Sequence, residues 1–145
     1  MDYLQMTAPC GLACFNCSYY LATENEERRK KPDRDFELNG IPPEVWLCKG
    51  CRNQKGMLKS HELFFNRKEP CPVYKCTSEK NIYFCYECSD FPCDHLHPCA
   101  DRAGTVPHNT KLFNLCLIQK MGLEHWAKDK AAAVHERYFH KWFKL

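Results

Sequence analysis

Cysteine thiols are the side chains with the clearest chemistry in this chain, because ten of its twelve cysteines fall into two groups of five. The first group lies in CGLACFNC and CKGC and consists of Cys10, Cys14, Cys17, Cys48 and Cys51. The second group has the spacing C-x4-C-x8-C-x2-C-x4-C and consists of Cys71, Cys76, Cys85, Cys88 and Cys93. Thiolates at C-x2-C spacing are typical ligands of tetrahedral metal centres. The spacing therefore predicts a metal-binding protein.

The cellular compartment decides whether so many cysteines form disulfides or bind metal. The N-terminal sequence MDYLQMTAPCG has neither the basic nor the apolar segment of a signal peptide. No apolar run approaches the ~20 residues that a membrane span requires. We therefore expect a cytoplasmic protein with reduced thiols and no membrane association, in which the cysteines hold metal.

Zinc is the metal that the spacing favours, with two structural sites of four cysteines each. One site would take the four cysteines of two C-x2-C knuckles, Cys14, Cys17, Cys48 and Cys51. Two foursomes fit the second site, either Cys71, Cys76, Cys85 and Cys88 or Cys76, Cys85, Cys88 and Cys93. Two such sites leave two thiols over. An iron–sulfur or thiol redox protein therefore stays open as the alternative, because clusters are held by cysteines at similar intervals.

The expected fold is a small α+β protein in which zinc-knuckle loops staple a cysteine-rich lobe over residues 8–98. Within it, residues 82–84 read as a short strand that leads into the Cys85 knuckle. A helix is expected to begin at Tyr19 and to end before Pro32. Its last turn carries four consecutive cations, residues 28–31, which we interpret mainly as a solvated helix end.

A helical C-terminal segment, residues 108–143, is expected to pack against this lobe, so that the two form one compact domain. Asn109 or Thr110 is a suitable N-cap for its first helix. Gly122 is a suitable residue to end that helix. Cys116 lies on the apolar part of this helix, where a thiol usually behaves as a small hydrophobic side chain.

Charge and histidines add little to the thiol chemistry. The net charge is +3 and the pI is about 8.2, short of the strongly basic composition of a dedicated nucleic-acid binder. His95 and His97 flank the second cysteine group and could replace a cysteine as ligand, while Cys99 lies outside the regular spacing. An all-cysteine site usually closes the coordination sphere, which disfavours an enzyme. A binding module for protein or nucleic acid is therefore the favoured function.

Four motifs, CGLACFNCSYYLATENEE, CKGC, CPVYKC and CYECSDFPC, resemble in this order the small cysteine-rich proteins grouped as domain of unknown function 3795. These proteins occur largely in anaerobic bacteria and archaea. The tail PHNTKLFNLCLIQKMGLEHWAK is similar to the C-terminal extension of many members, so the resemblance covers residues 8–128. It implies that the ten grouped cysteines occupy the family's cysteine positions and bind metal, usually zinc. It implies no reaction and no catalytic residue.

Overall fold

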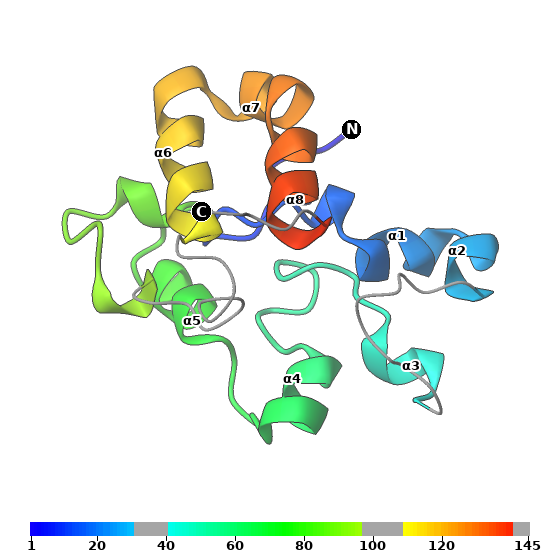
Figure 1. Cartoon of the computed structure of the whole chain (residues 1–145). Helices are drawn as coiled ribbons and strands as arrows, with labels where there is room; N and C mark the ends of the chain where they lie inside the picture. Colours follow the sequence, from blue (N-terminus) through cyan, green and yellow to red (C-terminus); the bar gives the residue numbers. More distant parts are fainter. Residues whose placement is uncertain (31–40, 97–108, 141–145) are drawn as a thin grey trace, which may run out of the picture.

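Helices form the regular structure of the described residues, which are 1–30, 41–96 and 109–140 of the computed structural model (Figure 1). The α-helices are α1 (Ser18–Glu24), α2 (Glu26–Lys30), α3 (Pro43–Trp46), α4 (Lys59–Phe65), α5 (Pro72–Glu79), α6 (Thr110–Met121), α7 (Leu123–Asp129) and α8 (Ala131–His140). Three short 3-10 turns join them, η1 (Cys14–Asn16), η2 (Cys85–Glu87) and η3 (Asp94–Leu96). The expected boundary between lobe and C-terminal segment, residues 98–108, lies outside the described residues.

The α+β prediction is wrong, because the described residues contain no sheet. Their β pairing amounts to one isolated antiparallel bridge between Thr7 and Ala13. Within the expected strand over residues 82–84, side chains hydrogen-bond to the backbone groups that would otherwise pair with a neighbouring strand. The Arg52 guanidinium donates to the Tyr83 carbonyl at 2.7 Å, and the Glu87 carboxylate accepts from the Tyr83 amide at 3.0 Å. A backbone satisfied in this way needs no strand beside it.

The helix expected from Tyr19 to Lys31 is interrupted at Asn25. This residue is extended, and its side-chain oxygen accepts from the amides of Glu27 and Arg28 at 2.9 and 3.2 Å, which makes it the N-cap of α2. Arg29 then folds back and donates to the carbonyls of Ala22 and Thr23 at the end of α1. The sequence did not predict this break, because the run of acidic residues followed by basic residues, which is typical of one helix, continues on both sides of Asn25.

The first C-terminal helix, α6, begins and ends where the sequence predicts. The Asn109 side chain caps α6 by accepting from the amides of Lys111 and Leu112, both at 3.1 Å. Gly122, at φ +80°, ends α6 and precedes α7. Helices α6 and α8 stand side by side, and α7 joins them at one end (Figure 1). None of the described helices is both long and apolar enough to span a bilayer.

One hydrophobic cluster joins these helices to the cysteine-rich part of the chain. Trp126 is fully buried, and its ring meets Phe15 edge-on at a centroid distance of 5.9 Å. Phe15 lies between Cys14 and Cys17. The buried Asn114 side chain accepts from the Trp126 indole at 3.3 Å and donates to the Gly11 carbonyl at 2.9 Å. The C-terminal helices therefore support the backbone of the first thiol loop.

Candidate metal centre

The first thiol loop is a tight turn that contains Cys10 and Cys14 and continues into η1. The Ala8 amide donates to the Leu12 carbonyl at 2.9 Å, and the Cys17 amide donates to the Cys14 carbonyl at 2.9 Å. Gly11 adopts φ +85°, and a Cβ built there would lie 3.0 Å from the Lys111 carbonyl oxygen. Only glycine satisfies both the backbone angle and the close approach of α6.

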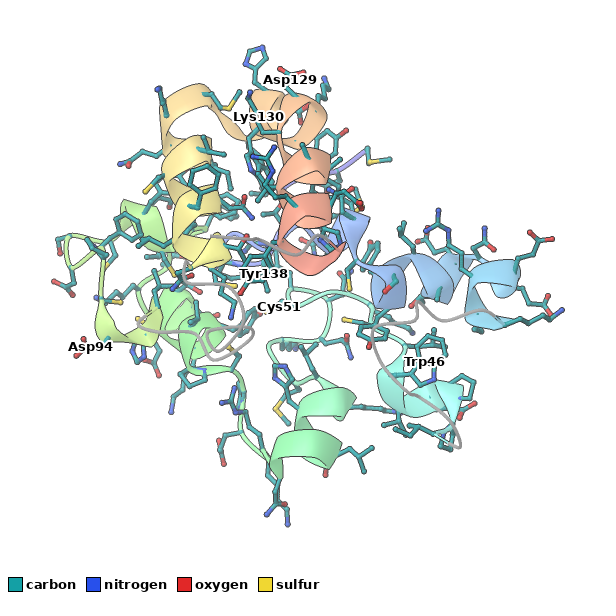
Figure 2. The ribbon with its side chains drawn as sticks, in the orientation of Figure 1. Trp46, Cys51, Asp94, Asp129, Lys130 and Tyr138 are labelled. Atoms are coloured by element: carbon teal, nitrogen blue, oxygen red, sulfur yellow. The ribbon has the colours of Figure 1, made fainter. Side chains whose placement is uncertain are left out.

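The second knuckle, Cys48–Cys51, lies against the first. The Gly50 amide donates to Cys48 Sγ at 3.3 Å, and the backbone of Cys51 hydrogen-bonds to the Cys14 thiol. Gly50 has φ +86°, and a Cβ there would approach the Tyr20 ring at 3.2 Å. Cys51 lies near the middle of the molecule, below the end of α8 that carries Tyr138 (Figure 2). Amide-to-sulfur hydrogen bonds of this kind orient thiolates that bind metal.

The third knuckle, Cys85–Cys88, repeats the turn of the first. The Cys88 amide donates to the Cys85 carbonyl at 3.1 Å, and the Asp90 amide donates to Cys88 Sγ at 3.5 Å. The Lys80 ammonium donates to Cys88 Sγ at 3.0 Å and to Asp90 Oδ2 at 2.7 Å. Cys88 therefore has two hydrogen-bond donors on its sulfur, one of them charged.

The pKa values of the thiols indicate which sulfurs are neighbours. Burial raises the pKa of Cys14 to about 12. The backbone hydrogen bond from Cys51 lowers this pKa, and the charges of the cysteines at 48, 17 and 10 raise it further. Burial likewise raises the pKa of Cys85 to about 12, helped by the cysteines at 10, 93, 76 and 88. Cys14 is thus affected by cysteines of its own group, whereas Cys85 is affected by Cys10 of the first group and by three of the four other cysteines of its own.

Cys71 lies beside the first group rather than within its own. The pKa of Cys51 is raised by burial and then by the charges of Cys10, Cys71 and Cys14. The backbone explains this position, because the Cys71 amide donates to the Gly56 carbonyl at 3.0 Å and the Gly56 amide donates to the Cys51 carbonyl at 2.9 Å. Sequence spacing gave no signal of this neighbourhood, since Cys71 begins the second run of cysteines.

The sulfurs themselves have not converged on a common point. The eleven described cysteines form no disulfides with one another. Among the described residues, no three His, Cys, Asp or Glu side chains stand close enough together to hold a metal ion. The knuckle backbones fit thiolate ligands, whereas metal binding would require the side chains to turn toward one another.

The family comparison covers the cysteine-rich part of the chain. Residues 6–98 match the family described as protein of unknown function DUF3795. The chain belongs to this family. The matched segment of this DUF3795 protein contains all ten grouped cysteines and ends before α6, so the similarity of the tail stays a prediction. Searches of curated proteins and of solved structures gave no match.

The remaining candidate ligands of this DUF3795 protein are exposed or lie outside the described residues. His95 is exposed in η3, and His97 and Cys99 are outside the described part of the chain. Cys116 is exposed on α6, so it does not pack as the small hydrophobic side chain that the sequence predicts. Lys80 and Asp90 were not singled out by sequence, because no motif relates the lysine that follows α5 to the third knuckle.

Replacing Lys80 by methionine (Lys80→Met) should weaken metal retention about tenfold, because partners of metal ligands tune affinity by about 10- to 100-fold. The pKa of Lys80 is raised by its bond to Asp90 and then by Cys88. The pair is exposed, so the fold should be unchanged. Competition against a chromophoric zinc chelator measures the effect. Lys75→Met, at an exposed position on α5, is the matched control and should retain metal normally.

Proposed function

We propose that this protein binds metal ions through cysteines of its two groups, at two four-cysteine sites, with zinc as the metal and structural support of a binding module as the role. The proposal is carried by the amide-to-sulfur hydrogen bonds of the knuckles. Gly50 donates to Cys48 and Asp90 donates to Cys88, each from two residues further along the chain. The bond from the Cys51 backbone to the Cys14 thiol joins two knuckles that are distant in sequence. Such donors favour a charged sulfur over a neutral one.

The charge balance also supports a cation. Burial and mutual repulsion keep Cys14 and Cys85 protonated at neutral pH, since the pKa of each is raised to about 12. Burying several thiolates together without a positive charge is costly. A zinc ion would supply that charge and replace the thiol protons. Zinc and iron both accept a tetrahedral sulfur environment, so the iron–sulfur alternative is decided by measurement.

The neighbouring thiols favour one of the two foursomes that the spacing left open. Cys85 is affected first by the charge of Cys10 and then by those of Cys93, Cys76 and Cys88. Cys71 instead affects Cys51, to whose backbone it is tied through Gly56. We therefore propose Cys76, Cys85, Cys88 and Cys93 as the ligands of the second four-cysteine site. The first site takes its ligands from the first two knuckles: Cys14, Cys17, Cys48 and Cys51.

Elemental analysis of protein purified without oxygen tests the choice of metal. Colourless protein that contains zinc supports the proposal. Brown protein that contains iron and sulfide and absorbs near ~400 nm would refute zinc as the metal and support an iron–sulfur cluster held by the cysteines. Protein that neither retains nor takes up a thiophilic metal would refute metal binding altogether.

Metal uptake should release about one proton per cysteine ligand, or about eight for two four-cysteine sites at pH 7. The reason is that the pKa values of Cys14 and Cys85 lie far above neutral, so the metal must displace protons. Affinity should therefore rise with pH throughout the range below these pKa values. Calorimetry in buffers of different ionisation enthalpy counts the protons. Metal uptake without proton release would contradict thiolate ligation.

The described part of the basic run favours a protein over a nucleic acid as the module's partner. Arg29 is engaged with the end of α1, and Lys30 pairs with Glu26 at 3.2 Å. Two of the cations are thus used within the helices. Neutralising Arg28 and Lys30 together should leave salt-dependent retention on a polyanion unchanged, and a clear loss of retention would restore nucleic acid as the partner.

A further inference from the structure

Positive charge is concentrated between the second knuckle and the second cysteine group. Residues 49–70 contain six Lys or Arg and two Glu, whereas the rest of the chain contains 15 Lys or Arg and 16 Asp or Glu. The formal net charge of this basic segment, six minus two, therefore exceeds the +3 of the whole chain. Arg52 serves the fold, because its guanidinium donates to the carbonyls of Thr7 and Tyr83. The other five cations are exposed: Lys49, Lys55, Lys59, Arg67 and Lys68.

The exposed cations of the basic segment make no ion pair with any residue that the structure describes. The described ion pairs join other lysines, those at 30, 80 and 128, to acidic partners. Lys59 is the first residue of α4, where a cation is unfavourable because the positive end of the helix dipole lies there. Helix stability therefore does not account for Lys59, and ion pairing accounts for none of the five charges. A role in binding remains.

Helix α4 stands on a loop whose base is closed at Gly56. The Gly56 amide donates to the Cys51 carbonyl at 2.9 Å, and the Gly56 carbonyl accepts from the Cys71 amide at 3.0 Å. Residues 57–70 thus leave the fold and return at one point, with α4 at the edge of the molecule opposite α7 (Figure 1). Helix α4 packs against α3, and the described side chains of residues 57–69 belong to neither hydrophobic cluster. This loop therefore adds surface rather than core.

Two aliphatic side chains are exposed among these cations. Leu63 of α4 is 56% exposed, and Met57, shortly before the helix, is 42% exposed. Leu63 follows Lys59 by four residues, so the two lie on one face of α4. Cations beside exposed aliphatic side chains complement a segment that carries acidic and aliphatic side chains together, such as an acidic amphipathic helix. Single-stranded nucleic acids are bound instead by stacking of bases on aromatic side chains, so the aliphatic side chains favour a protein partner.

We propose that α4 and its flanking loops, residues 55–68, dock an acidic amphipathic helix of a partner protein. This inference rests on the binding-module role in the proposed function and names the chemistry of the module's partner. The cations of this stretch face the partner's carboxylates, and Leu63 and Met57 meet its aliphatic side chains. Zinc at Cys48 and Cys51, as proposed, would fix the base of the loop, because the Cys51 carbonyl is bonded to Gly56.

Fluorescence anisotropy with a labelled peptide tests the proposal. The peptide carries glutamate and leucine at helical spacing and has about 18 residues, enough for an amphipathic helix. Protein purified with its metal should bind it, and binding should weaken as salt rises, because exposed charges are screened. Lys55→Gln/Lys59→Gln should weaken binding about tenfold, since each exposed ion pair contributes little by itself. Leu63→Ser should also weaken it about tenfold, through the lost apolar contact.

Lys120→Gln/Lys130→Gln is the matched control, because it removes the same charge from exposed positions. Lys130 lies at the junction of α7 and α8, opposite α4 (Figure 2). This variant should bind the peptide as wild-type protein does. Equal weakening by the two double variants would show an effect of net charge alone and overturn the docking surface. Unchanged binding in Lys55→Gln/Lys59→Gln or in Leu63→Ser would also overturn it.

A labelled single-stranded oligonucleotide and the metal content of each sample separate the other outcomes. Tighter binding of the oligonucleotide than of the peptide, lost in the same lysine variant, would overturn a protein partner in favour of nucleic acid. Protein that retains zinc but binds no peptide would overturn this inference and leave the proposed metal binding intact. Protein that binds the peptide but holds no metal would support the docking surface and count against the metal sites. Unchanged circular dichroism verifies that each variant folds.

Discussion

Removing the bound metal with a strong chelator should unfold the cysteine-rich part of the chain, at a cost on the order of 10 kcal/mol in folding free energy. The structural reason is that short turns and helices of four to eight residues make up this region. Isolated helices of this length are marginal in water. The third knuckle and α5 should lose their order when Cys85 loses its proposed metal. The loss should spread, because buried Cys85 also belongs to the shared hydrophobic cluster.

Circular dichroism and tryptophan emission measure this loss. Trp126 is a local reporter, because its fully buried ring contacts Phe15 inside the first knuckle. Its emission should shift to the red once the knuckle opens. Replacing Trp46 and Trp142 by phenylalanine isolates the signal, and readding zinc under reducing conditions should restore it. Unchanged dichroism after verified metal removal would contradict a structural role for the metal.

The C-terminal helices should loosen together with the knuckles rather than survive alone. Helix α8 packs against η1, and α6 packs against η2. Leu115 and Ile118 of α6 are buried in the same cluster as Cys10 and Cys85. Metal bound at the knuckles, as proposed, would therefore stabilise the C-terminal helices, and these helices would stabilise the knuckles.

Local signals predicted the C-terminal helices well and the cysteine-rich region poorly. A capping asparagine at 109 and a glycine at 122 act within one turn of the chain, so the sequence alone specifies them. The strand expected over 82–84 depended on a neighbouring strand that does not exist among the described residues. Instead, the side chain of Arg52, which is distant in sequence, donates a hydrogen bond to the Tyr83 carbonyl. Non-local side chains of this kind leave no periodic pattern.

The same distinction applies to the candidate site. Cysteine spacing identified the pairs within each knuckle, because those two cysteines are close in sequence. It did not place Cys71 beside Cys51, since that contact depends on the bonds of Gly56 to both segments. Gly56 itself has φ +75°, and a Cβ there would lie 2.8 Å from the Tyr74 side chain. The grouping of thiols is therefore a property of the folded backbone rather than of the interval between cysteines.

Substituting Gly11 by alanine (Gly11→Ala) should destabilise the metal-loaded protein by about 3 kcal/mol and weaken metal retention. A side chain at φ +85° costs about 1–2 kcal/mol. The new Cβ would also press on the Lys111 carbonyl and the Leu115 side chain, both at 3.0 Å, and overpacking of this kind costs about 1–3 kcal/mol. Relief requires the Cys10–Cys14 loop to move away from α6 and from the Asn114 hydrogen bond that holds it. Urea unfolding and competition with a chelator measure the two effects.

Gly122→Ala is the matched control, because Gly122 has a similar φ of +80° but nothing within 4 Å of the added Cβ. It should show the backbone strain, about 1–3 kcal/mol, without any change in metal retention. The difference between the two variants in chelator competition therefore isolates the contact between α6 and the first thiol loop. Equal metal retention in Gly11→Ala and Gly122→Ala would mean that α6 does not position the thiols of this loop. In that case the C-terminal helices would stabilise the fold without acting on the metal centre.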